Sequence, residues 1–179
     1  MTRRRWVSLP ICLLAVTALV ASPAGAAPPP QEFCGVCGEA LTNAAEDVGV
    51  DLTVERATAT VDIRADGRAR WDARVTLGTG ADRLAANATL RERIVRDTYD
   101  HGRTVVDDPR NLTTRVANGT LVVAFDTDEV ARRSVGGVVL VDALDRSDQR
   151  SGLRLDADEL RISGPNGSAV TNLPRGATV

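Results

Sequence analysis

Two cysteines separated by two residues are the part of the sequence best suited to chemistry. Cys34 and Cys37 stand in Cys34-Gly-Val-Cys37, directly before a segment with helical periodicity. A helix N-terminus favours a thiolate, because its unpaired N–H groups and its dipole stabilise negative charge. The spacing is therefore compatible with a redox dithiol, with part of a metal site, or with a structural disulfide.

The surroundings of the pair favour the disulfide. Thioredoxin-like enzymes carry Cys-x-x-Cys after a core strand, whereas here prolines 28–30 precede it and no proline separates the cysteines. A zinc site needs about four ligands, and only His101 and carboxylates remain to complete one. We therefore expect a Cys34–Cys37 disulfide formed in an oxidising exterior, with no metal and no cofactor. Redox catalysis by the pair is the enzymatic alternative.

The other polar residues form no recognised catalytic or metal motif. His101 is the only histidine, and it follows a helix end, where a solvated histidine interacts favourably with the helix dipole. No Gly-x-Ser-x-Gly motif occurs. The acidic stretches 126–129 and 156–159 lack the full loop of a calcium site. We therefore predict no catalytic residue, and we expect solvated carboxylates or helix caps in the acidic stretches.

The N-terminus predicts export. Residues 1–26 combine a basic start, an apolar run over 6–20 and small residues that allow cleavage after Ala26. The run is about 15 residues long, shorter than the roughly 20 that a membrane span needs. The start Thr-Arg-Arg also resembles a twin-arginine signal. We expect a cleaved signal peptide and a location outside the cell or at its surface; an uncleaved anchor is the alternative.

Composition limits the partners and the organisation. Without the three arginines of the predicted signal peptide, 19 basic residues face 24 acidic ones, so the mature chain carries a net charge of −5. Nucleic-acid binding needs a basic face, so we expect no nucleic-acid partner. Every basic residue is arginine and aspartate outnumbers glutamate, as is typical of a G+C-rich genome and a salt-loving organism. The length suits one domain with an aliphatic core.

Alternating apolar residues predict a long hairpin. Residues 50–63 and 69–77 alternate around a turn at Asp66-Gly67. A three-residue loop places Val61 opposite Trp71, and this register buries one face only. A loop of this length is a type I turn followed by a left-handed glycine.

Helical and strand signals alternate along the rest of the chain. A short helix is predicted over 38–48, and a longer one over 79–100 with a capping-box-like start at Thr79 and Asp82. Asn118-Gly119 predicts a second hairpin. The apolar run 137–141 predicts a central strand covered on both faces.

These elements predict an α+β fold. We expect a mostly antiparallel sheet built from hairpins, with one or two helices packed on one face. Short strands near 153–155, 160–162 and 169–170 complete it. The predicted organisation is a signal peptide at 1–26, a Pro-rich leader with Cys-x-x-Cys at 27–37, and a single domain at 38–179.

Four sequons are candidates for glycosylation in an exported chain. They begin at Asn87, Asn111, Asn118 and Asn166. Asn118 and Asn166 are the strongest, because Asn-Gly marks an exposed turn. Asn87 is the weakest, because it falls within a predicted helix.

Several features together resemble an uncharacterised family of exported, membrane-anchored haloarchaeal proteins. They are the exported start, the Cys-x-x-Cys, the hairpin through Trp71, and the segments RLAANATLRERI, VGGVVLVD and LDADELRISGPNG. The resemblance implies no known activity. Members commonly continue into a further strand and a C-terminal anchor, so we expect either a secreted variant or a C-terminally incomplete domain.

The expected function follows from these features. We expect an exported cell-envelope or secreted domain with a structural or interaction role and a partner in the envelope or outside the cell. Contact with a membrane would come only through an uncleaved N-terminus. A thiol–disulfide oxidoreductase using Cys34 and Cys37 is the alternative.

Overall fold

The computed structural model describes residues 30–106, 108–128, 130–133, 139–141, 152–165 and 167–171. The predicted signal peptide, its cleavage site and Asn166 lie outside these ranges. The described strands and helices, with their order along the chain, confirm the predicted α+β fold.

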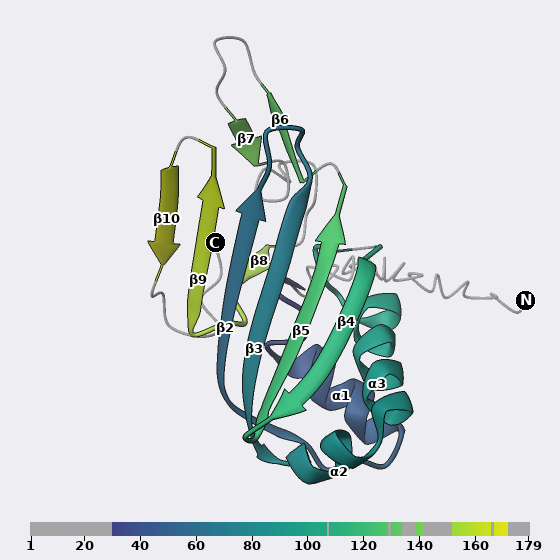
Figure 1. Ribbon diagram of the computed structural model, residues 1–179. Helices are drawn as coiled ribbons and strands as arrows, with labels where there is room; N and C mark the ends of the chain where they lie inside the picture. Colours follow the sequence, from purple (N-terminus) through teal and green to yellow (C-terminus); the bar gives the residue numbers. More distant parts are fainter. Residues whose placement is uncertain are drawn as a thin grey trace, which may run out of the picture.

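A six-stranded sheet in the order β10-β9-β2-β3-β5-β4 forms the centre of the fold (Figure 1). Its strands are β2 (Thr53–Ile63), β3 (Ala69–Thr79), β4 (Arg110–Ala117), β5 (Thr120–Thr127), β9 (Glu159–Gly164) and β10 (Gly167–Thr171). Neighbouring strands are antiparallel except β2 and β9, which are parallel. The sheet is therefore mostly antiparallel, as predicted.

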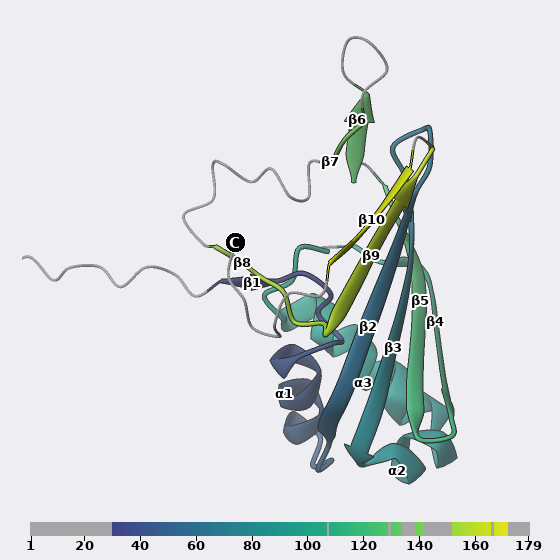
Figure 2. The same ribbon diagram turned by 90° about the vertical axis from the view of Figure 1, so that its left-hand side faces the viewer.

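Helices cover one face of this sheet. They are α1 (Glu39–Asp47) and α3 (Ala88–His101), and the short α2 (Ala81–Ala86) lies beyond the lower ends of the strands (Figure 1). Figure 2 shows the sheet nearly edge-on, with α1 and α3 on the same side of it. The apolar side chains of the long strands point toward these helices and form the core.

The first hairpin has the predicted register. Val61 lies opposite Trp71, and the N–H of Arg64 donates to the carbonyl of Arg68 at 2.8 Å, which closes the three-residue loop. Gly67 has a φ of +87°, in the left-handed region that glycine adopts without strain. Burial of one face therefore selected this register, as the sequence indicated.

The aromatic residues of the predicted mature chain form one cluster in the core. The indole of Trp71 lies 5.2 Å from the ring of Phe33 and 5.6 Å from that of Phe125. Tyr99 meets Phe125 edge-on at 5.1 Å. Aromatic pairs of this kind contribute about 0.5–1.5 kcal/mol each beyond their buried area. Phe33 thereby anchors the segment that carries the cysteines to the centre of the sheet.

The predicted helix over 79–100 is wrong in its start and its continuity. Gly80 precedes α2 and no side chain caps that helix, so Thr79 and Asp82 form no capping box. Asn87 interrupts the helix, and its Oδ1 accepts a hydrogen bond from the N–H of Leu90 at 3.0 Å. Asparagine is a strong N-cap, so the chain ends α2 and begins α3 at this residue.

The predicted central strand at 137–141 is also wrong. Its described part, β7 (Val139–Val141), pairs with β6 (Ala131–Arg133) in a separate two-stranded sheet. A short apolar run does not by itself determine where a strand lies. The long alternating strands β2 and β3 occupy the centre of the six-stranded sheet instead.

Candidate functional site

The candidate site is centred on a disulfide between Cys34 and Cys37, whose Cα atoms are 5.5 Å apart. Both residues lie in the core, with exposed fractions of 1% for Cys34 and 0% for Cys37. The predicted disulfide is therefore present, and it is sealed from solvent.

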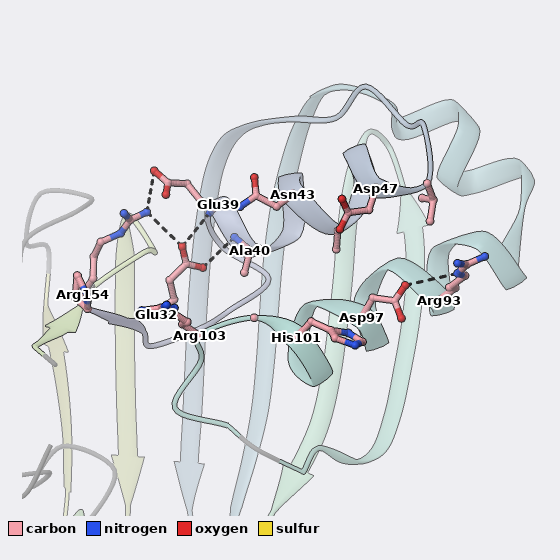
Figure 3. A pocket seen from close by; sticks show the side chains of 14 residues that line it. Glu32, Glu39, Ala40, Asn43, Asp47, Arg93, Asp97, His101, Arg103 and Arg154 are labelled. Carbon is pink, nitrogen blue, oxygen red and sulfur yellow. Dashed lines mark hydrogen bonds and ion pairs between the residues drawn. The ribbon is translucent and has the colours of Figure 1, made fainter. Parts of the chain in front are cut away.

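The carboxylate of Glu32, a residue that precedes α1 in the sequence, caps the helix that follows the disulfide. Gly38 stands at the N-cap of α1 and has no side chain to donate or accept. Glu32 takes over this role: its Oε1 accepts from the N–H of Glu39 and its Oε2 from the N–H of Ala40, each at 3.2 Å (Figure 3). Negative charge is favourable at this end of a helix. The sequence pattern missed this cap, because Glu32 lies well before the helix.

Arg154, which lies 122 residues further along the chain, binds the same carboxylate. Arg154 Nη2 lies 3.3 Å from Glu32 Oε1 and 3.2 Å from Glu39 Oε1 (Figure 3). The contact follows from strand pairing, since β1 (Gln31–Glu32) runs parallel to β8 (Leu153–Arg154). Sequence reasoning had assigned no role to Glu32 or Arg154.

Asp156 is the carboxylate nearest to the disulfide, and it is fully buried. Its Oδ1 accepts a hydrogen bond from the backbone N–H of Cys34 at 2.8 Å. Its Oδ2 has no hydrogen-bond partner among the described residues. A carboxylate oxygen of Asp156 and the two sulfur atoms all lie within 4.8 Å of one another. The structure therefore brings one residue of the predicted acidic stretch 156–159 to the cysteines.

Burial raises the pKa values of both Glu32 and Asp156. Burial, reinforced by the negative charge of Asp156, raises the pKa of Glu32 to about 7, although the N–H of Ala40 and Arg154 oppose the shift. Burial also raises the pKa of Asp156 to about 6, against hydrogen bonds from the N–H groups of Cys34 and Gly35. The negative charge of Asp156 thus contributes to the raised pKa of Glu32.

A groove of about 620 Å³ lies beside this cluster, between α1, the end of α3 and the β1–β8 pair (Figure 3). Glu32, Arg154 and the exposed His101 line it, whereas the two cysteines and Asp156 do not. Charged side chains of both signs line the groove, among them the ion pair of Arg93 and Asp97 at 3.6 Å. The disulfide is therefore not reached from this groove.

The acidic stretch 126–129 is engaged by arginines. Asp126 Oδ1 lies 3.4 Å from Nη1 of Arg70, and Asp128 pairs with Arg110. Asp158, in the second stretch, accepts from the N–H of Ala57 at 2.7 Å. These carboxylates hold parts of the fold together and do not converge on a common point with Asp156.

The described sequon asparagines are exposed. Asn118 occupies the β4–β5 turn with a φ of +50°, as the Asn-Gly signal predicts. Asn111 donates to Asp126 Oδ2 at 2.9 Å. Asn87 caps α3 and so lies between helices, not within one. Occupancy of these sites stays a prediction.

Comparison with known proteins found no matching family model, no matching curated protein and no matching solved structure. In the part of the chain that the structure describes, no helix is long and apolar enough to cross a membrane. The proposals that follow rest on the fold and on the residues around the disulfide.

Proposed function

We propose that the chain is an exported domain of the cell envelope or the extracellular space with a structural or interaction role, in which the Cys34–Cys37 disulfide is a staple. The burial of both cysteines carries this proposal. A thiol–disulfide enzyme attacks its substrate through an accessible thiolate. A sulfur enclosed by the core offers no such access, which favours a structural bond over catalysis.

The staple acts locally. A disulfide across three residues constrains the unfolded chain little compared with one that closes a long loop. It instead fixes the turn between Phe33, which packs on Trp71, and α1, whose first N–H groups bind Glu32. Such bonds persist in oxidising surroundings, which agrees with the predicted export.

The face of the sheet opposite the helices supports an interaction role. Charged side chains alternate with the core residues along β3, where Arg70 and Asp72 are half-buried and Arg74 is exposed. Arg74 Nε lies 3.4 Å from Asp72 Oδ1. Figure 2 shows this face turned away from α1 and α3, and the charged side chains that β3 places on it suit a polar partner outside the cell.

Intact mass of the protein from the culture medium and from membranes tests the proposal, with and without reductant and alkylation. We expect a chain that begins at Ala27, is two hydrogens lighter than the dithiol, and resists alkylation under mild reduction while folded. Added mass would count occupied sequons. Retention of residues 1–26 in the membrane fraction would contradict cleavage.

A thiol–disulfide oxidoreductase is the second candidate. It is favoured by the position of Cys34 and Cys37 before the N-terminus of α1 and by the carboxylate of Asp156 beside them. Redox enzymes of this type have potentials of about −270 to −120 mV. A reduction potential of the Cys34–Cys37 disulfide in this range, together with catalysed reduction of a protein disulfide, would support the oxidoreductase and contradict the structural role. A lower potential without turnover would support the structural role.

A further inference from the structure

Three side chains of types that bind zinc, two cysteines and an aspartate, converge in the core of this protein. The two sulfur atoms of Cys34 and Cys37 and a carboxylate oxygen of Asp156 lie within 4.8 Å of one another, and all three residues are almost completely buried. Oδ2 of Asp156 has no hydrogen-bond partner among the described residues. Leaving a buried polar atom unpaired is unfavourable, so this oxygen is available to a ligand.

We propose that reduction of the Cys34–Cys37 disulfide creates a binding site for a thiophilic divalent cation such as Zn²⁺, with Cys34, Cys37 and Asp156 as its protein ligands. Cys-x-x-Cys is the usual spacing of a zinc-binding cysteine pair, and zinc takes four ligands in a tetrahedral arrangement. Two thiolates and one carboxylate supply three of them, which leaves one position for a further ligand. This inference goes beyond the proposed structural role of the disulfide.

The chemistry balances with a dithiol as reductant. Two electrons and two protons pass from the dithiol to the Cys34–Cys37 bond, which breaks into two thiols, and the dithiol becomes a disulfide. Binding of the cation then releases the two thiol protons, because the ligands are thiolates. The sulfur atoms cannot bind the cation as thiolates while they are bonded to each other. The disulfide and the metal are thus mutually exclusive staples of the same turn.

The surroundings suit a site of this charge. Two thiolates, a carboxylate and a dication sum to a net charge of −1, and the guanidinium of Arg154 interacts electrostatically with Asp156. The N–H of Cys34 donates to Oδ1 of Asp156, which fixes the carboxylate, and Oδ2 has no hydrogen-bond partner among the described residues. Hydrogen bonds that orient a ligand raise the affinity of a metal site.

The test is metal titration of the full mature chain in two redox states. The protein is reduced without oxygen by a phosphine, which is then removed, and Co²⁺ and Zn²⁺ are added separately. We expect one ion per reduced chain by native mass spectrometry, a sulfur-to-cobalt charge-transfer band in the near ultraviolet, and no binding to the oxidised chain. Asp156→Asn should weaken binding by at least about tenfold. The control Glu46→Gln, at an exposed position on α1, should leave the affinity unchanged.

Folding of the reduced chain is followed by circular dichroism, so that every result is decisive. A folded, reduced chain without a cobalt–thiolate band would overturn the proposal, as would equal affinities of the wild type and Asp156→Asn. If the reduced chain unfolds, its refolding with one zinc ion per chain would support the site. Failure of zinc to refold it would count against the site.

Discussion

Oδ1 of Asp156 accepts a hydrogen bond from the N–H of Cys34 at 2.8 Å, across 122 residues of chain. A second contact over the same separation joins Arg154 to Glu32. Together they tie the segment before α1 to the segment before β9, which itself pairs with β2 at the centre of the sheet. These two contacts therefore link the start of the described chain to the segment that leads into β9.

The hydrogen bond of Asp156 can be tested by comparing two substitutions. Asp156→Ala removes the acceptor and leaves the buried N–H of Cys34 unpaired, whereas Asp156→Asn keeps an oxygen in the same place. We expect the alanine variant to be less stable than the asparagine variant by about 1–3 kcal/mol. Urea denaturation of the oxidised proteins at one pH measures the difference. Equal stabilities would mean that this hydrogen bond contributes nothing.

The raised carboxyl pKa values predict that the oxidised protein loses stability as the pH rises. The pKa of Glu32 is raised to about 7 and that of Asp156 to about 6, so the native state binds protons more tightly than the unfolded state. The contribution of these groups to the free energy of unfolding is complete at a pH below their pKa values in the unfolded chain. It is lost as the pH rises through their native pKa values of about 6 and about 7. The urea concentration at the unfolding midpoint should therefore decrease as the pH is raised from about 5 to about 8.

A matched pair of variants isolates the source of this pH dependence. Asp156→Asn removes one titrating group and its repulsion of Glu32, so the fall in the urea midpoint should become shallower. Asp72→Asn, on the solvent side of the sheet, should leave the slope as in the wild type. A wild-type midpoint that rises over the same pH range would refute the prediction.

The buried indole N–H of Trp71 predicts a cost for losing its partner. It donates to Oγ1 of Thr127 at 2.8 Å inside the core. Thr127→Val keeps the side-chain shape but removes the acceptor, so we expect a loss of about 1–3 kcal/mol in the free energy of unfolding. Thr76→Val, on the half-buried outer side of β3, is the control and should change stability much less. Chemical denaturation of both variants decides.

Two turn glycines separate backbone strain from steric contact. Gly67 and Gly119 have φ of +87° and +72°, where a side chain costs about 1–2 kcal/mol. A Cβ at Gly67 would collide with the backbone carbonyl of Ala131, whereas one at Gly119 would meet open space. Gly67→Ala should therefore destabilise the protein more than Gly119→Ala in thermal unfolding. Equal losses of thermal stability in the two variants would show that β6 moves away from the new Cβ with no loss of stability.

Local signals were sufficient for much of the fold. The alternation on both sides of Asp66-Gly67 determined the register of the first hairpin, because only one register buries a single face. The short helix predicted over 38–48 is present as α1, which spans Glu39–Asp47. The spacing of Cys34 and Cys37, together with the prolines that precede them, predicted their disulfide.

Local signals failed where long-range pairing competed with them. Thr79 has the chemistry of a helix cap, but it pairs with Thr53 as the last residue of β3. The apolar residues Val139–Val141 read as a central strand, yet they pair with β6 outside the six-stranded sheet. In both cases strand pairing decided what the segment became, and a window of sequence does not contain the partner strand.

The sequence by itself determined the class of fold, the first hairpin and the bond between Cys34 and Cys37. Only the tertiary structure decided that Asp156 lies beside that bond and that Arg154 pairs with Glu32. Their proximity depends on the parallel pairing of β1 with β8, two strands too short to show a periodic pattern. Burial of one face of a strand or helix produces a periodic pattern of apolar residues that can be recognised in the sequence. A contact between distant polar residues produces no such pattern.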